Sequence, residues 1–213
     1  MTRISGEQDL ENTYKLASAA DIVDYYHTFA TSYDTGFVQE MGYHYPKAIA
    51  EAYQKQATVD DTPVADIGCG TGIVAAELHL APDQIDGMDI SPEMLALAQE
   101  KGFYRRLYEV DLTGDLSAID NAYGAVVSAG TFTFGHLGPA PLRGLLRIAR
   151  PGALFIIGVN RAHFEKEHFA QILEDMTTQH EIGPVALEDI AMYAKPGHAH
   201  SDDRALVLQF RKV

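Results

Sequence analysis

The chain has 213 residues, a formal net charge of −14 at pH 7, and a composition that is 46% hydrophobic and 22% charged. These values are typical of a globular protein with one domain, or one domain and a small appendage. Phosphate contacts need clustered Lys and Arg, but here only Arg105-Arg106 and Lys212 are local hints, so we expect no nucleic-acid partner. A small neutral or cationic ligand suits the charge better.

The sequence predicts a cytoplasmic protein without membrane association. No apolar run approaches the roughly 18–20 residues of a membrane span. Residues 1–16 lack the apolar centre of a secretory signal. Cys69 is the single cysteine and cannot form an internal disulfide, which agrees with a reducing compartment.

Residues 1–58 are predicted to form a helical cap or lid, and residues 59–213 the main domain. Residues 1–20 are polar and weakly patterned, which indicates a loose or partly helical lead-in. Apolar residues recur at helical spacing over 21–31 and 46–57. The segment between these two helices is rich in Tyr and Gly, and a turn follows them.

From residue 63 onward, short strand-like runs alternate with helical patterns. Ser91 and Pro92 suit the N-cap and first position of a helix, and Pro151-Gly152 suit a helix stop. A Pro-Gly turn within 185–213 separates two strand-like segments, which predicts a terminal hairpin. We predict helices over 72–81, 92–101, 141–149 and 165–179, and strands over 63–68, 84–90, 104–112, 123–129 and 153–160.

This alternation predicts an α/β fold with a doubly wound, Rossmann-like sheet. The sheet should be mostly parallel, with helices on both faces, a C-terminal antiparallel hairpin strand and a small helical N-terminal lid. Ligands of such sheets bind outside the carboxyl ends of the strands. The unusual residues of the sequence fall at these ends.

The stretch VADIGCGTG, residues 64–72, places a glycine turn directly after the first strand. Glycines allow positive φ and close approach of a ligand to the backbone. The spacing GxGxG differs from the GxGxxG of dinucleotide-binding proteins and from the phosphate-binding GxxxxGK[ST]. Cys69 lies inside this turn without a second cysteine, so a small buried residue fits better than a redox centre.

Carboxylates end the next two strands. Asp89 follows the glycine turn by about twenty residues, a position from which a carboxylate can accept hydrogen bonds from a ribose diol. Asp111 ends the third strand, and the fourth is followed by SAGTFTFGHLGP, residues 128–139. Each residue alone could be an ordinary loop residue. Their combination after a glycine turn predicts a ligand site.

These motifs, in this order, resemble the class I S-adenosylmethionine-dependent methyltransferases. The resemblance covers roughly residues 60–160, with the terminal hairpin extending it to 213. Residues 88–139 further resemble the Williams–Beuren-region methyltransferase-like group. The stretches that carry the resemblance are VADIGCGTG, IDGMDISPEML, YEVDL, YGAVVSAG and IARPGALFIIGVN.

The resemblance implies S-adenosyl-L-methionine as cofactor and assigns positions around it. Asp66 and the glycines would form the methionine side, Asp89 would hold the ribose, and Asp111 the adenine amine. Residues 128–130 would lie near the sulfonium and methyl group. The cofactor-binding residues implied are Tyr33, Asp66, Gly68, Cys69, Gly70, Gly72, Asp89, Ile90, Met94, Asp111, Leu112, Ser128, Ala129 and Gly130.

The sequence offers one candidate catalytic residue, His136, which follows the fourth strand and titrates in the useful range. A loop histidine bonded to backbone is the alternative. Asn160 could orient an acceptor or cap a turn, and the N-terminal tyrosines could contact ligand or pack helices. The predicted substrate-binding residues are Tyr25, Tyr43, Phe134 and Asn160.

We predict no metal site, because the histidine groups at 163–168 and 197–203 lack metalloprotease spacing and suit a helix start and a hairpin tip. The expected function is methyl transfer to a small-molecule acceptor by a monomer or homodimer. Two alternatives stay open: an NAD(P)-dependent oxidoreductase and a non-catalytic cofactor-binding module. The missing third fingerprint glycine and the absence of a Tyr-x-x-x-Lys pair argue against the oxidoreductase.

Overall fold

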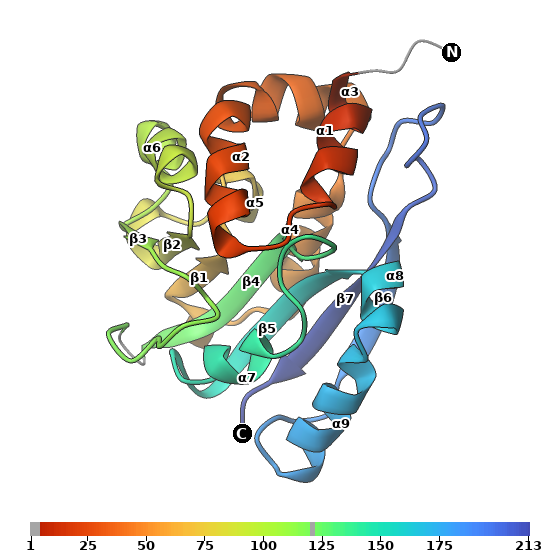
Figure 1. Cartoon of the computed structure of the whole chain (residues 1–213). Coiled ribbons are helices and arrows are strands. Elements are labelled where there is room, and N and C mark those ends of the chain that lie inside the picture. Colours follow the sequence, from red (N-terminus) through yellow and green to blue (C-terminus); the bar gives the residue numbers. More distant parts are fainter. Residues whose placement is uncertain (1–4, 120–121) are drawn as a thin grey trace.

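This computed structural model describes residues 5–119 and 122–213. Within them, seven strands form one sheet in the order β3-β2-β1-β4-β5-β7-β6 (Figure 1). β1 pairs in parallel with β2 and β4, β2 with β3, and β4 with β5. β7 is antiparallel to both β5 and β6. The strands are β1 (Val64–Ile67), β2 (Ile85–Asp89), β3 (Arg106–Glu109), β4 (Tyr123–Phe132), β5 (Ala149–Asn160), β6 (Ala186–Ala191) and β7 (Arg204–Arg211).

The predicted fold class is therefore confirmed, including the C-terminal hairpin. The chain runs outward from β1 to β3 and then returns to place β4 beside β1. This change of direction opens a crevice between the carboxyl ends of β1 and β4, the usual ligand position in doubly wound sheets.

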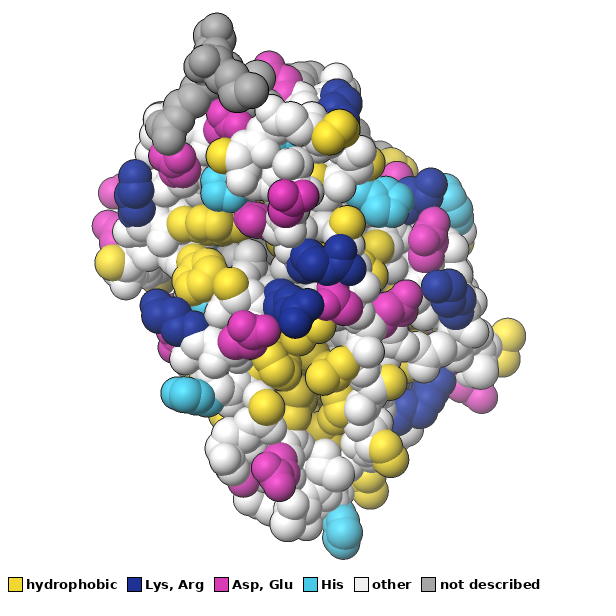
Figure 2. Space-filling model, turned by 90° about the vertical axis from the view of Figure 1, so that its right-hand side faces the viewer, with side chains coloured by type: hydrophobic (Ala, Val, Ile, Leu, Met, Phe, Trp, Pro, Cys, Tyr) yellow, Lys and Arg dark blue, Asp and Glu magenta, His cyan; other side chains and the backbone are white. Residues whose placement is uncertain are grey.

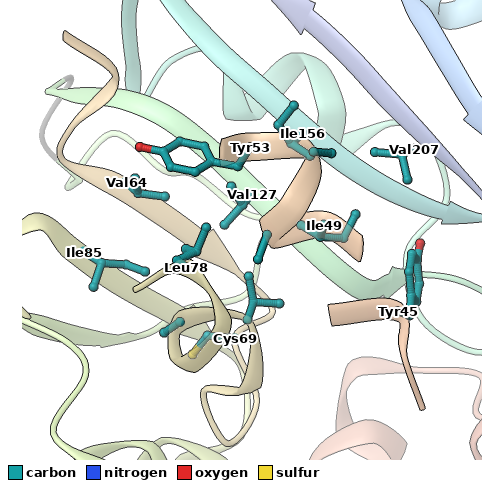
Figure 3. Close-up of a cluster of buried hydrophobic side chains, with 14 of the residues drawn as sticks. Tyr45, Ile49, Tyr53, Val64, Cys69, Leu78, Ile85, Val127, Ile156 and Val207 are labelled. Atoms are coloured by element: carbon teal, nitrogen blue, oxygen red, sulfur yellow. The ribbon is translucent and has the colours of Figure 1, made fainter. Parts of the chain in front are cut away.

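One face of the sheet is covered by α4 (Tyr45–Gln56), α5 (Ile73–Leu78) and α6 (Pro92–Lys101). Successive strand residues point to opposite faces, so Val64, Val127 and Ile156 pack against this layer. Figure 3 shows Tyr53 and Ile49 of α4 beside these strand residues, with Cys69 near Leu78. Cys69 belongs to this core, as expected of a small buried thiol.

The opposite face is covered by α7 (Pro141–Leu145), α8 (Arg161–Lys166) and α9 (Phe169–Thr178). The sequence predicted one helix over 165–179, and this is wrong. His168 has a left-handed φ of 57°, which ends one helix and lets the next begin in a new direction. Phe169, Leu173 and Met176 form the buried side of α9.

Other boundaries also differ from the prediction, two of them around the start of β5. The helix expected to end at residue 149 stops at Leu145, and Pro151-Gly152 lie inside β5 instead of ending a helix. The pairing of β4 with β5 is irregular between Tyr123 and Ala125, and a strand tolerates Pro at such an irregularity. Three short helical turns complete the chain: η1 (Tyr33–Val38), η2 (Val59–Asp61) and η3 (Pro82–Gln84).

The N-terminal segment adds α1 (Ser5–Thr13), α2 (Ala19–Ser32) and α3 (Gln39–Met41), of which α1 and α2 lie above the carboxyl ends of the strands (Figure 1). The lead-in is more helical than its weak pattern indicated. Ser18 begins α2 by accepting a hydrogen bond from the Asp21 amide. α4 packs into the core of the sheet, and the boundary at residue 58 between lid and domain stays a prediction.

Figure 2 shows the face formed by the β6 side of the molecule, where basic and acidic side chains are interspersed above a group of hydrophobic ones. Asp189 of β6 pairs there with Arg161 and Arg204. Leu187 is 52% exposed on the same edge strand. Within the described ranges, no helix combines the length and apolarity needed to cross a membrane.

Candidate functional site

A cavity of about 520 Å³ lies at the carboxyl ends of the strands, below α1 and α2. This volume is within the range of small-molecule sites, about 300–1,000 Å³. Its walls come from the ends of β2, β4 and β5, the glycine turn after β1, and the N-terminal helices. Segments far apart in the sequence therefore share one site.

The glycine turn is tied to the end of β2 through Asp89. The amides of Gly70 and Ser91 donate to the two Asp89 carboxylate oxygens at 2.8 and 2.9 Å. Gly68 has a φ of +62°, and a Cβ there would lie 2.0 Å from Thr131 Oγ1. Burial raises the pKa of Asp89, while the backbone amides favour its charged form. The fold thus holds this carboxylate at the cavity wall.

Asp66 lies beneath the turn and is fully buried. The Tyr104 hydroxyl donates to its Oδ2 at 2.7 Å, and its Oδ1 has no hydrogen-bond partner. Burial, opposed by the Tyr104 hydrogen bond and assisted by the nearby charge of Asp89, raises the pKa of Asp66 to about 7. A cation above the turn would favour the ionised form of Asp66.

An apolar slot with a carboxylate at its edge continues from Asp89 toward β3. Ile90, Met94 and Leu112 line it. Asp111 Oδ1 accepts hydrogen bonds from the Thr113 amide at 2.8 Å and the Thr113 hydroxyl at 2.7 Å. A flat ring with an edge amine fits such a slot, since carboxylates accept and aliphatic side chains cover its faces.

The end of β4 closes the cavity floor. Ser128 is fully buried and donates its hydroxyl to the Ile67 carbonyl at 2.7 Å, so it joins β4 to β1. Ala129 and Gly130 line the cavity. Gly130 has a φ of +81°, and a Cβ there would approach the Tyr43 hydroxyl to 2.9 Å.

His136 follows β4 and is held by two hydrogen bonds. Its Nδ1–H donates to the Phe134 carbonyl at 3.2 Å, so the neutral ring accepts at Nε2 from the Tyr26 hydroxyl at 3.2 Å. Burial lowers the pKa of His136. The ring is therefore neutral near pH 7 and can accept a proton.

His163 and Asn160 lie at the end of β5. The His163 amide donates to Asn160 Oδ1 at 3.1 Å, so Asn160 caps α8. His163 Nε2–H donates to the Leu137 carbonyl at 2.9 Å, which leaves Nδ1 unprotonated in the neutral ring. Burial lowers the pKa of His163 as well. Both roles weighed for Asn160 remain compatible, because it caps a helix and also lines the cavity.

Three polar contacts join α2 and η1 to the main domain near the glycine turn. Asp34 of η1 accepts from Thr71 Oγ1 at 2.6 Å and pairs with Lys101 of α6. His27 of α2 pairs with Glu93 of α6 at 2.7 Å. These contacts hold α2 and η1 over the site.

Most of the residues predicted for the site line the cavity. Those that do not are Tyr25, Asp66, Cys69, Gly72, Ser128 and Phe134, which lie beside or beneath it. Tyr25 instead donates to the Asp9 carbonyl at 3.2 Å. The predicted residues in the lining are Tyr33, Tyr43, Gly68, Gly70, Asp89, Ile90, Met94, Asp111, Leu112, Ala129, Gly130, His136 and Asn160.

Several lining residues were not predicted. Tyr14 precedes α2, Tyr193 follows β6, and Glu167 follows α8. No motif marks these three residues, whereas Tyr26 of α2 is one of the N-terminal tyrosines that the sequence offered as ligand contacts or packing residues. Across the described residues no group of three or more His, Cys, Asp or Glu side chains could hold a metal ion.

The chain is similar to known methyltransferases. Residues 65–157 match the family model described as a methyltransferase domain. Human methyltransferase-like protein 27 is 34% identical over 114 residues, which cover 52% of this chain and 45% of that protein. The match thus spans less than half of the human relative.

Solved structures share the fold. A Thermotoga maritima protein described as an S-adenosylmethionine-dependent methyltransferase, possibly acting on histamine nitrogen, aligns with a TM-score of 0.62 and 16% identity over 90% of this chain and all of its own. Magnesium protoporphyrin IX methyltransferase from Synechocystis, solved with bound S-adenosylmethionine, gives 0.61 and 18% over 92% of this chain and 98% of its own.

Proposed function

We propose that this protein is a class I S-adenosylmethionine-dependent methyltransferase that transfers the methyl group to a small-molecule acceptor by in-line displacement, which the match of residues 65–157 to a methyltransferase-domain model supports. The observation that supports this proposal best is the hydrogen bond from the glycine turn to Asp89 at the wall of a cavity of about 520 Å³. The lid helices and the cavity size favour a small acceptor over a macromolecule.

The residues present fit the cofactor. Asp89 and Asp111 supply carboxylates for hydroxyl and amine donors, and Ile90 and Leu112 supply apolar cover for a flat base. Asp66 Oδ1 is a buried oxygen without a partner beneath the turn, where a positive charge would stabilise it. We infer that Asp89 holds the ribose, Asp111 the adenine amine, and the turn after β1 the methionine portion.

S-adenosylmethionine supplies an activated methyl group on a positively charged sulfur. The protein has to align the acceptor with that methyl, hold it close and exclude water. Ala129 and Gly130 offer a floor without bulk at the centre of the cavity, and α1 and α2 cover it. His136 is placed to orient the acceptor or to accept its proton.

Two alternatives make different predictions. An NAD(P)-dependent oxidoreductase would also use Asp89, but it would saturate with a nicotinamide cofactor and not with S-adenosylmethionine. A non-catalytic binding module would bind the methyl donor tightly and show no transfer to any acceptor. We propose a cytoplasmic monomer or homodimer, with no nucleic-acid partner.

Calorimetry with S-adenosylhomocysteine tests the proposed site. Asp89→Ala removes charge-assisted hydrogen bonds, so we expect binding to weaken by about 1–3 kcal/mol. Asp115→Ala is a matched control, because Asp115 makes the same kind of short-range hydrogen bond to the Ser117 amide but is exposed and outside the cavity. Wild-type affinity in Asp89→Ala, or saturation by NADH alone, would refute the assignment.

A further inference from the structure

The charged groups of the cavity all have one sign. Asp89, Asp111 and Glu167 line it, and they come from the ends of three different elements. No Lys or Arg belongs to the lining within the described ranges. Lys166 lies outside the lining, has a side chain that is 67% exposed, and pairs with Glu167 at 3.5 Å.

The two histidines of the lining do not supply positive charge. Each donates one ring N–H to a backbone carbonyl, His136 to Phe134 and His163 to Leu137. The second nitrogen of His136 faces the Tyr26 hydroxyl, a donor that an uncharged ring can accept from. Burial lowers the pKa of both rings, which agrees with uncharged imidazoles.

Aromatic rings cover the same end of the cavity. Tyr14, Tyr26, Tyr43 and Tyr193 all line it, and the rings of Tyr43 and Tyr193 lie 5.6 Å apart. The faces of aromatic rings attract ammonium groups. Both Glu167 and the tyrosine rings therefore favour a positively charged group at this end of the cavity.

This charge pattern disfavours anionic methyl acceptors and favours neutral amines. Oxygen and sulfur nucleophiles attack as phenolate, carboxylate or thiolate, and the Glu167 carboxylate in the lining opposes that negative charge. A neutral amine attacks with its own lone pair and gains positive charge in the transition state, which the same groups stabilise.

We propose, on the basis of the proposed function, that the methyl acceptor is an amine held at the β5 end of the cavity beside Glu167. The nitrogen lone pair forms the new N–C bond while the C–S bond breaks. The electron pair of that bond stays on sulfur, and the surplus proton of the nitrogen leaves to His136 or to water. Glu167 acts as a specificity residue that favours amines over anions of the same size.

Binding of matched probes tests the proposal. The wild-type protein is first saturated with S-adenosylhomocysteine and then titrated with 2-phenylethylamine, 2-phenylethanol and phenylacetate, which differ little in size. We expect the amine to bind at least about tenfold more tightly than phenylacetate, with 2-phenylethanol between them. Equal affinities, no binding of the amine, or preference for phenylacetate overturns the proposal.

Two charge-removing variants test whether the preference for the amine depends on the Glu167 carboxylate. Glu167→Gln should weaken binding of the amine about fivefold and leave binding of 2-phenylethanol unchanged. Glu174→Gln makes the same charge change on an exposed residue of α9 and should change neither. An equal loss in both variants contradicts a specific role for Glu167.

The same experiment separates this inference from the function it rests on. Failure of S-adenosylhomocysteine to bind refutes the methyltransferase function itself. Binding of S-adenosylhomocysteine together with methyl transfer to a phenol or a carboxylate, and none to amines, leaves that function intact and refutes the amine acceptor.

Discussion

The two ends of the cavity are built in different ways. At the β1–β3 end, carboxylates are held by nearby backbone: Asp89 by the Gly70 and Ser91 amides, and Asp111 by Thr113. At the β4–β5 end, side chains from distant parts of the chain meet, as Tyr26 meets His136 across 110 residues. The hydrogen bonds that hold these carboxylates at the first end join residues at most 19 positions apart, whereas the second end depends on how the N-terminal helices pack.

The comparison predicts that the β1–β3 end tolerates backbone changes least. Gly68→Ala places a Cβ at a φ of +62° and 2.0 Å from Thr131 Oγ1, so we expect a loss of about 2–4 kcal/mol in the free energy of unfolding. Gly70→Ala is the matched control, because its Cβ would meet nothing within 4 Å. Urea denaturation measures both, and an equal loss in the two variants would show that strain at positive φ dominates over contact.

At the other end we expect a large effect on rate and a small one on cofactor binding. His136→Ala should lower kcat about 100-fold if the ring accepts a proton, since general-base catalysis contributes roughly 10²–10⁴-fold. Its affinity for S-adenosylhomocysteine should change little. Single-turnover rates and calorimetry on the same preparations measure the two quantities, and an unchanged kcat would show that alignment alone carries the reaction.

Two tyrosine variants compare a buried hydroxyl that donates a hydrogen bond with a buried hydroxyl that has no partner. Tyr104→Phe removes the donor to buried Asp66 and should cost about 1.5–3 kcal/mol of stability at pH 8. Tyr193→Phe removes a buried hydroxyl that has no partner in the structure, so the stability should not fall. Thermal unfolding of the two variants and the wild type measures these stability changes. A loss in Tyr193→Phe as large as in Tyr104→Phe would remove the distinction.

The smallest effect concerns the exposed contact between α2 and α6. The hydrogen bond with Glu93 raises the pKa of His27 above 6.5, and it lowers that of Glu93 below 4.5. The His27 contribution is present below pH 6.5 and is lost as the pH rises through the raised value. The Glu93 contribution is lost as the pH falls through the lowered value.

The pair should therefore stabilise the protein between about pH 4.5 and 6.5. We expect His27→Gln to lower the Tm by only about 1 °C at pH 5.5 and by less at pH 8.5, because exposed pairs are weak. A larger Tm difference at pH 8.5 than at pH 5.5 would contradict the assignment.

The sequence by itself determined the fold class and the β1–β3 end of the site. Glycine turns, strand-end carboxylates and the Ser91-Pro92 helix start are local signals, because each is set by the conformation of a few neighbouring residues. Asp89 could be identified for that reason. The same signals placed Ser128 and Asp66 near the site, but could not tell that both are buried behind its wall.

Only the tertiary structure decided the β4–β5 end. The break at His168 overrides a helical pattern, and no spacing announces that Tyr26 lies against His136 or that Glu167 lines the cavity. These neighbours are joined by packing between elements and not by chain connectivity, and amino-acid type limits such packing only weakly. The sequence thus leaves unmarked Glu167, the residue that we propose favours an amine acceptor.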